Sequence, residues 1–299
     1  MSEGFRERIT ELVDLAGQPD TVSGDSAQIA VMRSVSGGDM TDAYRVDLED
    51  GRTVFAKTHR DPPPGFFSTE AAGLRWLDEP GVINVARVIG VADSAPSCLV
   101  LEWIDEGRQP DREGEADFGR SLAALHQSGA ESFGRSDGRT TGSLALPNDP
   151  CDTWAEFYAE RRLRPLAQIA AERHALSNST IANLLDVAER LDDFPGSDEP
   201  PARLHGDLWA GNRIIDAHGA SWLIDPACHG GHREFDLAMM QLFGGFGDDC
   251  YRSYDEAYPL TPGWQARVPL HQLAPLVVHA IKFGGHYPGA VDRALAELT

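Results

Sequence analysis

The 299-residue sequence has few cysteines, few lysines, no excess of basic charge and no long hydrophobic run. Its four cysteines, Cys98, Cys151, Cys228 and Cys250, are scattered, which argues against a disulfide framework and against a cysteine metal site. The longest apolar stretch, at 273–281, is too short to span a bilayer, and the N-terminal segment lacks the apolar core of a signal peptide. We therefore expect a cytoplasmic protein that does not enter a membrane.

Basic charge is also scarce, and almost all of it is arginine. Asp and Glu number 47 against 26 Lys and Arg, which gives a formal net charge of −21. Because nucleic-acid backbones and anionic lipids attract basic surfaces, this balance argues against partners of either kind. Only Lys57 and Lys282 are lysines, so a lysine in an apolar strand segment needs an explanation.

Residue periodicity divides the chain into a small strand-rich N-terminal lobe, residues 1–103, and a larger, mainly helical C-terminal lobe, residues 104–299. In the first lobe we expect helices at 3–16 and 67–78 and strands at 28–34, 43–48, 53–58, 86–92 and 97–103. In the second we expect helices at 118–126, 181–191 and 264–283, interrupted by a short β segment at 213–224. The predicted fold class is α+β, with no internal repeat.

The strongest chemical signal is the segment LHGDLWAGN, residues 204–212, followed by RIIDAHGASWLIDP. Apolar pairs in the second segment predict a β-hairpin with residues 218–219 at its tip. That register places Asn212 beside Asp225 at the open end of the hairpin, with Asp207 on the loop before it. Two carboxylates and an amide oxygen at one spot favour bound Mg²⁺. For any one of these residues alone, the better explanation is a turn in which its side chain hydrogen-bonds to backbone groups.

The spacing of Asp207 and Asn212 is that of the catalytic loop of kinases, where the aspartate acts as base and the asparagine and a later aspartate hold metal. That template requires a lysine and a helical glutamate earlier in the chain. Lys57 ends the strand segment TVFAK, and Glu70 lies in the apolar stripe of the helix at 67–78. Because a buried acid needs a partner, we predict that Lys57 pairs with Glu70 rather than that both are surface residues.

Two weaker signals lie at positions where a nucleotide would bind. Gly37 and Gly38 stand between two strands, where backbone N–H groups would be able to approach ATP phosphates, although a plain hairpin turn explains them equally well. The connector of Glu102, Trp103 and Ile104 is expected to hydrogen-bond adenine through the carbonyl of its first residue and the N–H of its last. The alternative for this connector is a buried edge strand.

Trp209 and three histidines each have more than one interpretation. Trp209 belongs either to the core or to a platform for a ligand, through stacking or a cation–π contact. His205 is expected to support the loop through hydrogen bonds rather than take part in chemistry. His229 and His232 form an H-x-x-H pair, but no third ligand follows at helical spacing, which disfavours a metallohydrolase.

Taken together, the motifs GG, FAK, LEWI, LHGDLWAGN, LIDPACHGGHREFDLAM and LFGGF resemble the fructosamine/ketosamine-3-kinase family. That family belongs to the aminoglycoside-phosphotransferase-like branch of the kinase fold, and the resemblance covers nearly the whole chain. It implies a two-lobed, protein-kinase-like α+β fold. It also implies that Asp207 accepts a proton, that Asn212 and Asp225 hold magnesium, and that Lys57, oriented by Glu70, binds phosphate.

The resemblance further implies that Asp236, in EFDLA, anchors the catalytic loop, which agrees with a carboxylate at a helix N-terminus. It implies ATP and Mg²⁺ as cofactors and, as the reaction, phosphorylation of the 3-hydroxyl of a ketosamine. The substrate would be a small sugar amine or a glycated lysine, and the role deglycation. In two places the chain departs from related patterns. Pro226 stands where protein kinases have Phe-Gly, and the glycine loop carries Asp39 and no cysteine, which argues against thiol control through that loop.

Two alternative functions stay open at this point. The first is a kinase for another hydroxylated amine, such as an aminoglycoside, choline or homoserine, and the motif around Trp209 argues against it. The second is a non-catalytic nucleotide-binding module. Such a module is expected to have lost a catalytic residue, whereas this chain keeps Lys57, Asp207, Asn212 and Asp225.

Overall fold

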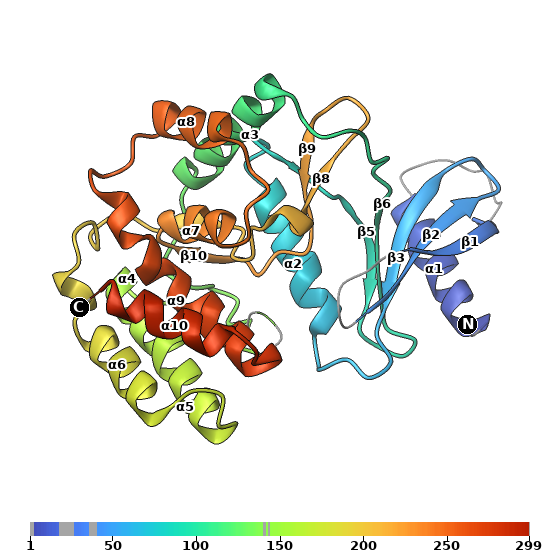
Figure 1. Ribbon diagram of the computed structural model, residues 1–299. Coiled ribbons are helices and arrows are strands. Elements are labelled where there is room, and N and C mark those ends of the chain that lie inside the picture. The colour runs from blue at the N-terminus through green and yellow to red at the C-terminus, as the bar shows by residue number, and fades with distance from the viewer. Residues whose placement is uncertain (1–2, 18–26, 36–40, 140–141, 143, 299) are drawn as a thin grey trace. The chain divides into compact units, whose positions relative to one another are not determined.

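The computed structural model describes the chain except for residues 1–2, 18–26, 36–40, 140–141, 143 and 299 (Figure 1). Its residues form two compact units. The first comprises Met1–Gln109 and Ile214–Asp225, and the second comprises Pro110–Arg213 and Pro226–Thr299. The late β segment therefore belongs with the N-terminal residues. The division into a nucleotide-binding lobe, 1–103, and a catalytic lobe, 104–299, remains a prediction about function.

The first unit is built on a five-stranded antiparallel sheet with the order β1-β2-β3-β6-β5 (Figure 1). Its strands are β1 (Ile29–Val35), β2 (Asp42–Leu48), β3 (Thr53–Thr58), β5 (Val88–Ala92) and β6 (Cys98–Glu102). Its two helices are α1 (Glu3–Ala16) and α2 (Phe66–Asp78). The sequence predicts all of these elements with closely similar ends, and the structure confirms them.

Strand β3 lies in the middle of this sheet, and its successive side chains face opposite sides. Val54 and Ala56 pack with buried residues of α1, among them Ile9 and Val13, so α1 covers one face of the sheet. Lys57 therefore points to the other face. A lysine directed into a covered face is unusual, because its ammonium must find partners there.

Helix α2 supplies one partner, Glu70, from the opposite face. Its side chains Phe67, Leu74 and Leu77 are almost fully buried, and each such burial stabilises the fold by about 1.5–3 kcal/mol. Glu70 lies in the same helical stripe, so the packing of α2 brings its carboxylate to the Lys57 ammonium. The apolar stripe thus determines where the acid lies.

A second, three-stranded sheet contains the late β segment, with the order β4-β9-β8. Its strands are β4 (Asn84–Val85), β8 (Arg213–Ile215) and β9 (Ser221–Leu223). Strand β4 runs parallel to β9, and the N–H of Ala86 donates to the carbonyl of Leu223 at 3.0 Å. The predicted β-hairpin is therefore present and is held against β4 of the first unit.

The register predicted for this hairpin is wrong by one residue. The N–H of Asp216 donates to the carbonyl of Ala220 at 2.9 Å, whereas the prediction pairs Asp216 with Ser221. The reason is a three-residue loop in place of a two-residue one. Gly219 takes its left-handed position, with φ of +86°, and the Asp216 carboxylate accepts two loop N–H groups. Asn212 lies outside the strands, so hairpin pairing does not set it opposite Asp225.

The second unit is mainly helical (Figure 1). Its helices are α3 (Arg112–Gln127), α4 (Trp154–Tyr158), α5 (Arg164–Glu172), α6 (Asn178–Glu189), α7 (Glu234–Phe243), α8 (Asp248–Ala257), α9 (Trp264–Phe283) and α10 (Tyr287–Ala296). A π-helical turn, η1 (Ala159–Leu163), joins α4 to α5, and short 3₁₀ turns lie at η2 (Leu191–Asp193) and η3 (Ala210–Asn212). The helices predicted at 118–126, 181–191 and 264–283 correspond to α3, α6 and α9.

The core of this unit lies between α4, α5, α6, α9 and α10, where Leu163, Leu184, Leu273 and Val291 are fully buried. Two short strands, β7 (Ala202–Leu204) and β10 (His229–Gly231), pair antiparallel beside this core. They hold in place the loop that follows β7, which contains the predicted catalytic residues.

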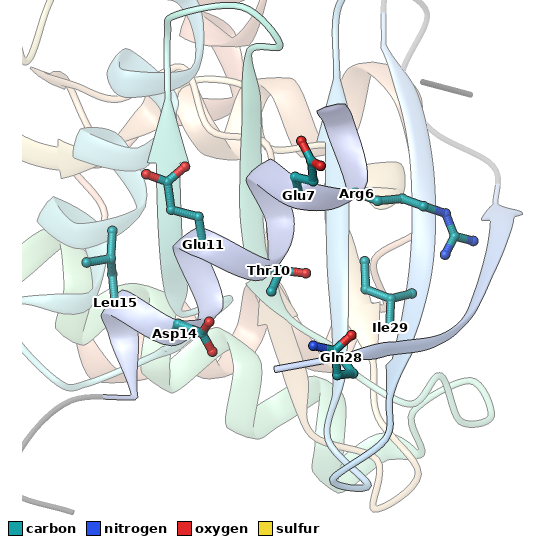
Figure 2. A pocket seen from close by; sticks show the side chains of 8 residues that line it. All are labelled: Arg6, Glu7, Thr10, Glu11, Asp14, Leu15, Gln28 and Ile29. Atoms are coloured by element: carbon teal, nitrogen blue, oxygen red, sulfur yellow. The ribbon is translucent and has the colours of Figure 1, made fainter. Parts of the chain in front are cut away.

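A surface hollow lies between α1 and β1 of the first unit (Figure 2). Its lining residues are Arg6, Glu7, Thr10, Glu11, Asp14, Leu15, Gln28 and Ile29. None of the residues predicted for the site lies among them, so this hollow is separate from the predicted chemistry. Over the part of the chain that the structure describes, no helix combines the length and the apolar character needed to cross a membrane.

Candidate functional site

Lys57 is the centre of a buried ion-pair cluster in the first unit. It lies on β3 between Ala43 of β2 and Leu99 of β6 and is only 5% exposed. Its Nζ lies 2.6 Å from Oε1 of Glu70 and donates a hydrogen bond to Oδ1 of Asp225. The predicted pairing of Lys57 with Glu70 is confirmed, and a residue 168 positions further along the chain joins it.

Two opposing effects act on the charges of this cluster. Burial alone would lower the pKa of Lys57, but the carboxylates of Glu70 and Asp225 outweigh burial and hold that pKa above its ordinary value. Burial raises the pKa of Glu70, and the Lys57 ammonium limits the rise. The sheet therefore keeps a permanent positive charge at a fixed place, in contact with two acidic side chains.

Asp225 occupies an unusual backbone position just after β9. Its φ is +50°, in the left-handed region that non-glycine residues rarely adopt, and Pro226 follows it directly. Such a conformation persists only where the surrounding structure holds it, and it is concentrated at functional sites. Strand β9, which ends two residues before Asp225, is paired with β4.

In the second unit, a buried carboxylate holds the loop after β7. Asp236, in the first turn of α7, accepts hydrogen bonds from the backbone N–H groups of His205 at 2.8 Å and Gly206 at 2.9 Å. Burial alone would raise the pKa of Asp236, but the hydrogen bond from His126, together with its charge and the backbone donors, holds that pKa below its ordinary value. The structure thus contains the loop anchor that was predicted at Asp236.

The contacts behind Asp236 were not found from the sequence. His126 lies with Nε2 3.3 Å from the Asp236 carboxylate and with Nδ1 2.8 Å from the hydroxyl of Tyr254. Both are buried, and they link α3 and α8 to the loop anchor. The sequence gives no signal for this chain of contacts because 128 residues separate His126 from Tyr254.

Asp207 and Asn212 are hydrogen-bonded to each other within the same loop. The amide nitrogen of Asn212 donates to the backbone carbonyl of Asp207 at 2.8 Å and to its carboxylate at 3.1 Å. Nδ1 of His205 accepts the N–H of Asp207 at 3.2 Å, as expected of a supporting residue. Gly206 has φ of +79°, and a Cβ there would lie 2.2 Å from the carbonyl oxygen of Ala227, so the loop requires glycine. These contacts fix the direction of the Asp207 carboxylate.

Trp209 is a surface residue. Its side chain is 41% exposed, which rules out the interpretation that it belongs to the core. The indole lies against Gly211, where a Cβ would come within 2.2 Å of the ring, and the ring of Phe243 lies 6.2 Å away at an angle of 64°. The indole is therefore an exposed flat surface held in one orientation, two residues after Asp207.

The remaining nucleotide-binding predictions concern the two glycines before β2 and the connector after β6. Gly37 and Gly38 lie outside the described residues. The Glu102 carboxylate accepts a backbone N–H at 2.7 Å, and the Trp103 indole donates to a neighbouring carboxylate at 2.8 Å. Ile104 is 9% exposed. The adenine contacts expected from this connector stay predictions.

His232 belongs to a buried cluster that also contains Glu234 and His271, whose ligand atoms lie within 4.8 Å of one another. His271 could not be recognised as a third ligand from the sequence, because it comes from the distant helix α9. A metal does not fit here. Arg267 donates to both carboxylate oxygens of Glu234, while His232 already donates to the carbonyl of Gly196 and accepts a backbone N–H. The cluster is a buried ion pair between α7 and α9.

The burial of His229 predicts a measurable pH dependence of the free energy of unfolding. This residue is buried between the rings of Phe157 and Phe235, and burial lowers its pKa from 6.5 to about 3. Between these pH values the unfolded chain binds the proton more tightly. The free energy of unfolding therefore falls as the pH drops below about 6.5, by about 1.4 kcal/mol per pH unit for this one group.

Replacing His229 by phenylalanine, which does not titrate, removes one proton-binding group. The slope of unfolding free energy against pH is therefore expected to fall by about 1.4 kcal/mol per pH unit. Urea unfolding of wild type and His229→Phe between pH 7 and pH 5 measures it. His218→Gln, in the exposed hairpin loop, is the matched control and should keep the wild-type slope. Equal slopes for His229→Phe and wild type would contradict the assignment.

Comparisons with known proteins agree with this geometry. A family model described as fructosamine kinase matches residues 14–299. A probable ketoamine kinase from Lactiplantibacillus plantarum is 36% identical over 271 residues, which cover 90% of this chain and 94% of that protein. The crystal structure of a candidate fructosamine-3-kinase from Thermobifida fusca has a TM-score of 0.87 and 40% identity, covering 100% of this chain and 99% of that chain.

A more distant structure, the choline kinase LicA from Streptococcus pneumoniae, covers 99% of both chains with a TM-score of 0.65 and 16% identity. That likeness concerns the fold alone. The chain has the protein-kinase-like fold of the aminoglycoside phosphotransferases, with an N-terminal antiparallel sheet followed by a mainly helical C-terminal region. The fold class predicted from the sequence is confirmed.

Proposed function

Because the chain belongs to the fructosamine kinase family, we propose that it transfers the γ-phosphoryl group of ATP to the 3-hydroxyl of a ketosamine. Membership confirms the family resemblance found in the sequence and makes the chain an ATP-using phosphotransferase with an alcohol group as acceptor. The observation that carries the finer proposal is the extent of the family match, over residues 14–299, which includes every residue given a role below. The name of the Thermobifida fusca relative supports the 3-hydroxyl.

We assign phosphate binding to Lys57. Its ammonium is buried, permanently charged and fixed by Glu70 at 2.6 Å, so it presents a point charge at one place. Glu70 pairs with the lysine, and we assign it the role of a positioning residue. The compact ammonium suits this buried place, whereas arginine would bring a broad planar group, and this agrees with the rarity of lysine in the chain.

The residues assigned to magnesium fit that ion chemically. Asp225 would offer a carboxylate oxygen, and Asn212 would offer its amide oxygen, because its amide nitrogen donates to Asp207. Hard oxygen donors of this kind are those that Mg²⁺ takes, together with water and substrate phosphate. When bound, the ion neutralises negative charge on the phosphate oxygens.

We assign proton acceptance to Asp207. Its carboxylate is half-buried and oriented by Asn212, and its loop is anchored by Asp236. Asp207 would hold the sugar hydroxyl in line for attack and take its proton. Trp209, two residues later, offers an exposed ring on which the sugar stacks or the protonated amine makes a cation–π contact.

The product of this reaction has a predictable fate. A phosphate on C3 is attached to the carbon next to the C2 carbonyl of the ketosamine, two carbons away from C1, which carries the amine. Loss of a proton from C1 gives an enaminol, which expels inorganic phosphate from C3. Water then releases the amine and leaves a 3-deoxy-dicarbonyl sugar. Deglycation would follow without any further catalytic residue.

The test is turnover of purified protein with Mg-ATP and a panel of acceptors. With N-methylfructosamine we expect ADP to form at once, followed by slower release of methylamine and inorganic phosphate. Asp198→Asn, which alters an exposed acid of the second unit, serves as the matched active control. Turnover of choline, homoserine or an aminoglycoside without turnover of any ketosamine would replace the proposal by a kinase of that other amine. ATP binding without any turnover would point to a binding module.

A further inference from the structure

Trp209 is one end of a continuous row of aromatic rings on the second unit. We name this row the aromatic ledge, and its members are Trp209, Phe243, His279, Phe283 and Tyr287. Ring centroids lie 6.2 Å apart from Trp209 to Phe243, 5.0 Å from Phe243 to His279 and 5.4 Å from His279 to Phe283. Tyr287 flanks His279 at 4.9 Å. The rings come from the loop before η3, the end of α7, the end of α9 and the start of α10.

Both ends of the ledge are open to solvent. Trp209 is 41% exposed and Phe283 is 52% exposed, which places them among the exposed large hydrophobic side chains of the described residues. Phe243, His279 and Tyr287 between them are half-buried. Isolated exposed apolar residues are ordinary, but a connected row that begins two residues from Asp207 marks a binding surface.

We propose that the aromatic ledge binds the substituent on the amine nitrogen of the ketosamine, and that this substituent is an uncharged apolar arm. The inference rests on the proposed function and specifies the substrate for it. A sugar whose hydroxyl reaches Asp207 lies at the Trp209 end. The nitrogen then directs its other substituent along the ledge towards Phe283.

The charge at the far end decides which arm fits. Nζ of Lys282 lies 5.1 Å from the ring centroid of Phe283, so this ring already has a cation beside it. A second positive charge at the end of the arm would be repelled there. The ledge therefore favours a neutral alkyl or aryl arm over one of the same length that ends in an ammonium group.

The experiment compares three substrates: N-methyl-, N-pentyl- and N-(5-aminopentyl)fructosamine. In wild type we expect kcat/KM for the pentyl substrate to exceed that for the methyl substrate by about 3- to 10-fold, mainly through KM, because apolar contact with an open aromatic surface is of that size. The aminopentyl substrate should lose most of this gain. Phe283→Ala should abolish the gain and leave the methyl substrate unchanged.

Two further variants separate the parts of the proposal. Lys282→Gln should improve the aminopentyl substrate relative to wild type and leave the methyl substrate unchanged. Leu15→Ala truncates an exposed apolar side chain of the first unit and should keep the wild-type pattern for all three substrates. Because Phe283 and Lys282 are exposed, neither change should impair folding, and equal kcat/KM values for the methyl substrate would verify this.

The outcomes distinguish the ledge from the reaction. Suppose that the methyl substrate is turned over, but that kcat/KM for the pentyl substrate is no higher, or stays equally high in Phe283→Ala. The ledge then does not bind the substituent, and the proposed function stands. If the aminopentyl substrate is preferred in wild type, the neutral-arm assignment is wrong. If no fructosamine is turned over at all, the proposed function and the ledge fail together.

Discussion

Asp207→Asn is expected to lower kcat by about 10²- to 10⁴-fold, the usual contribution of a positioned proton acceptor. Asparagine keeps the size of the side chain and an oxygen that can accept the hydrogen bond from Asn212, now 3.1 Å long. The loop therefore keeps its shape while the ability to take a proton is lost. ATP affinity should stay close to wild type, since Asp207 is assigned to the acceptor rather than to the nucleotide.

Steady-state kinetics with N-methylfructosamine and ATP binding measured by calorimetry test this pair of expectations. Asp198→Asn makes the same chemical change at an exposed position and should leave kcat unchanged. Thermal unfolding verifies that both variants are folded. A folded Asp207→Asn protein with kcat within about threefold of wild type would remove Asp207 from the role of base.

The Lys57 cluster shows what the sequence could predict. Strand alternation sets the face of Lys57, and helical periodicity puts Glu70 in the same stripe as Phe67 and Leu74. Each of these rules acts over a few residues, and each charged group lies in a pattern that is otherwise apolar. Two local patterns, combined with the need of a buried acid for a partner, were enough to pair residues on different elements.

The rest of the site depends on contacts that no local pattern records. His126 reaches Asp236 from α3, Tyr254 reaches His126 from α8, and His271 reaches Glu234 from α9. Their positions follow from tertiary packing, which one sequence does not reveal. The hairpin error has a more local cause. Gly219 adopts a left-handed conformation, and the hairpin loop has three residues instead of two. The amino-acid sequence of this segment is compatible with both loop lengths.

The other large effect is expected at Asp225. Asp225→Asn should weaken magnesium-dependent ATP binding by more than about 100-fold, since loss of groups that only support a metal ligand already costs 10- to 100-fold. Asparagine is the suitable replacement because it tolerates the left-handed backbone at φ of +50° better than alanine does. It also leaves Lys57 paired with Glu70 at 2.6 Å, so the variant should fold.

Glu70→Gln provides the matched control because both acids contact the same ammonium. If Asp225 holds magnesium and Glu70 only positions Lys57, the two variants should differ in how their ATP affinity depends on magnesium. Glu70→Gln should raise KM for ATP while affinity still rises with magnesium concentration, whereas in Asp225→Asn that dependence should disappear. Titrating ATP at several magnesium concentrations separates these cases. A normal magnesium dependence in Asp225→Asn would place the metal on other residues, and an equal loss in both variants would mean that the two carboxylates act only through Lys57.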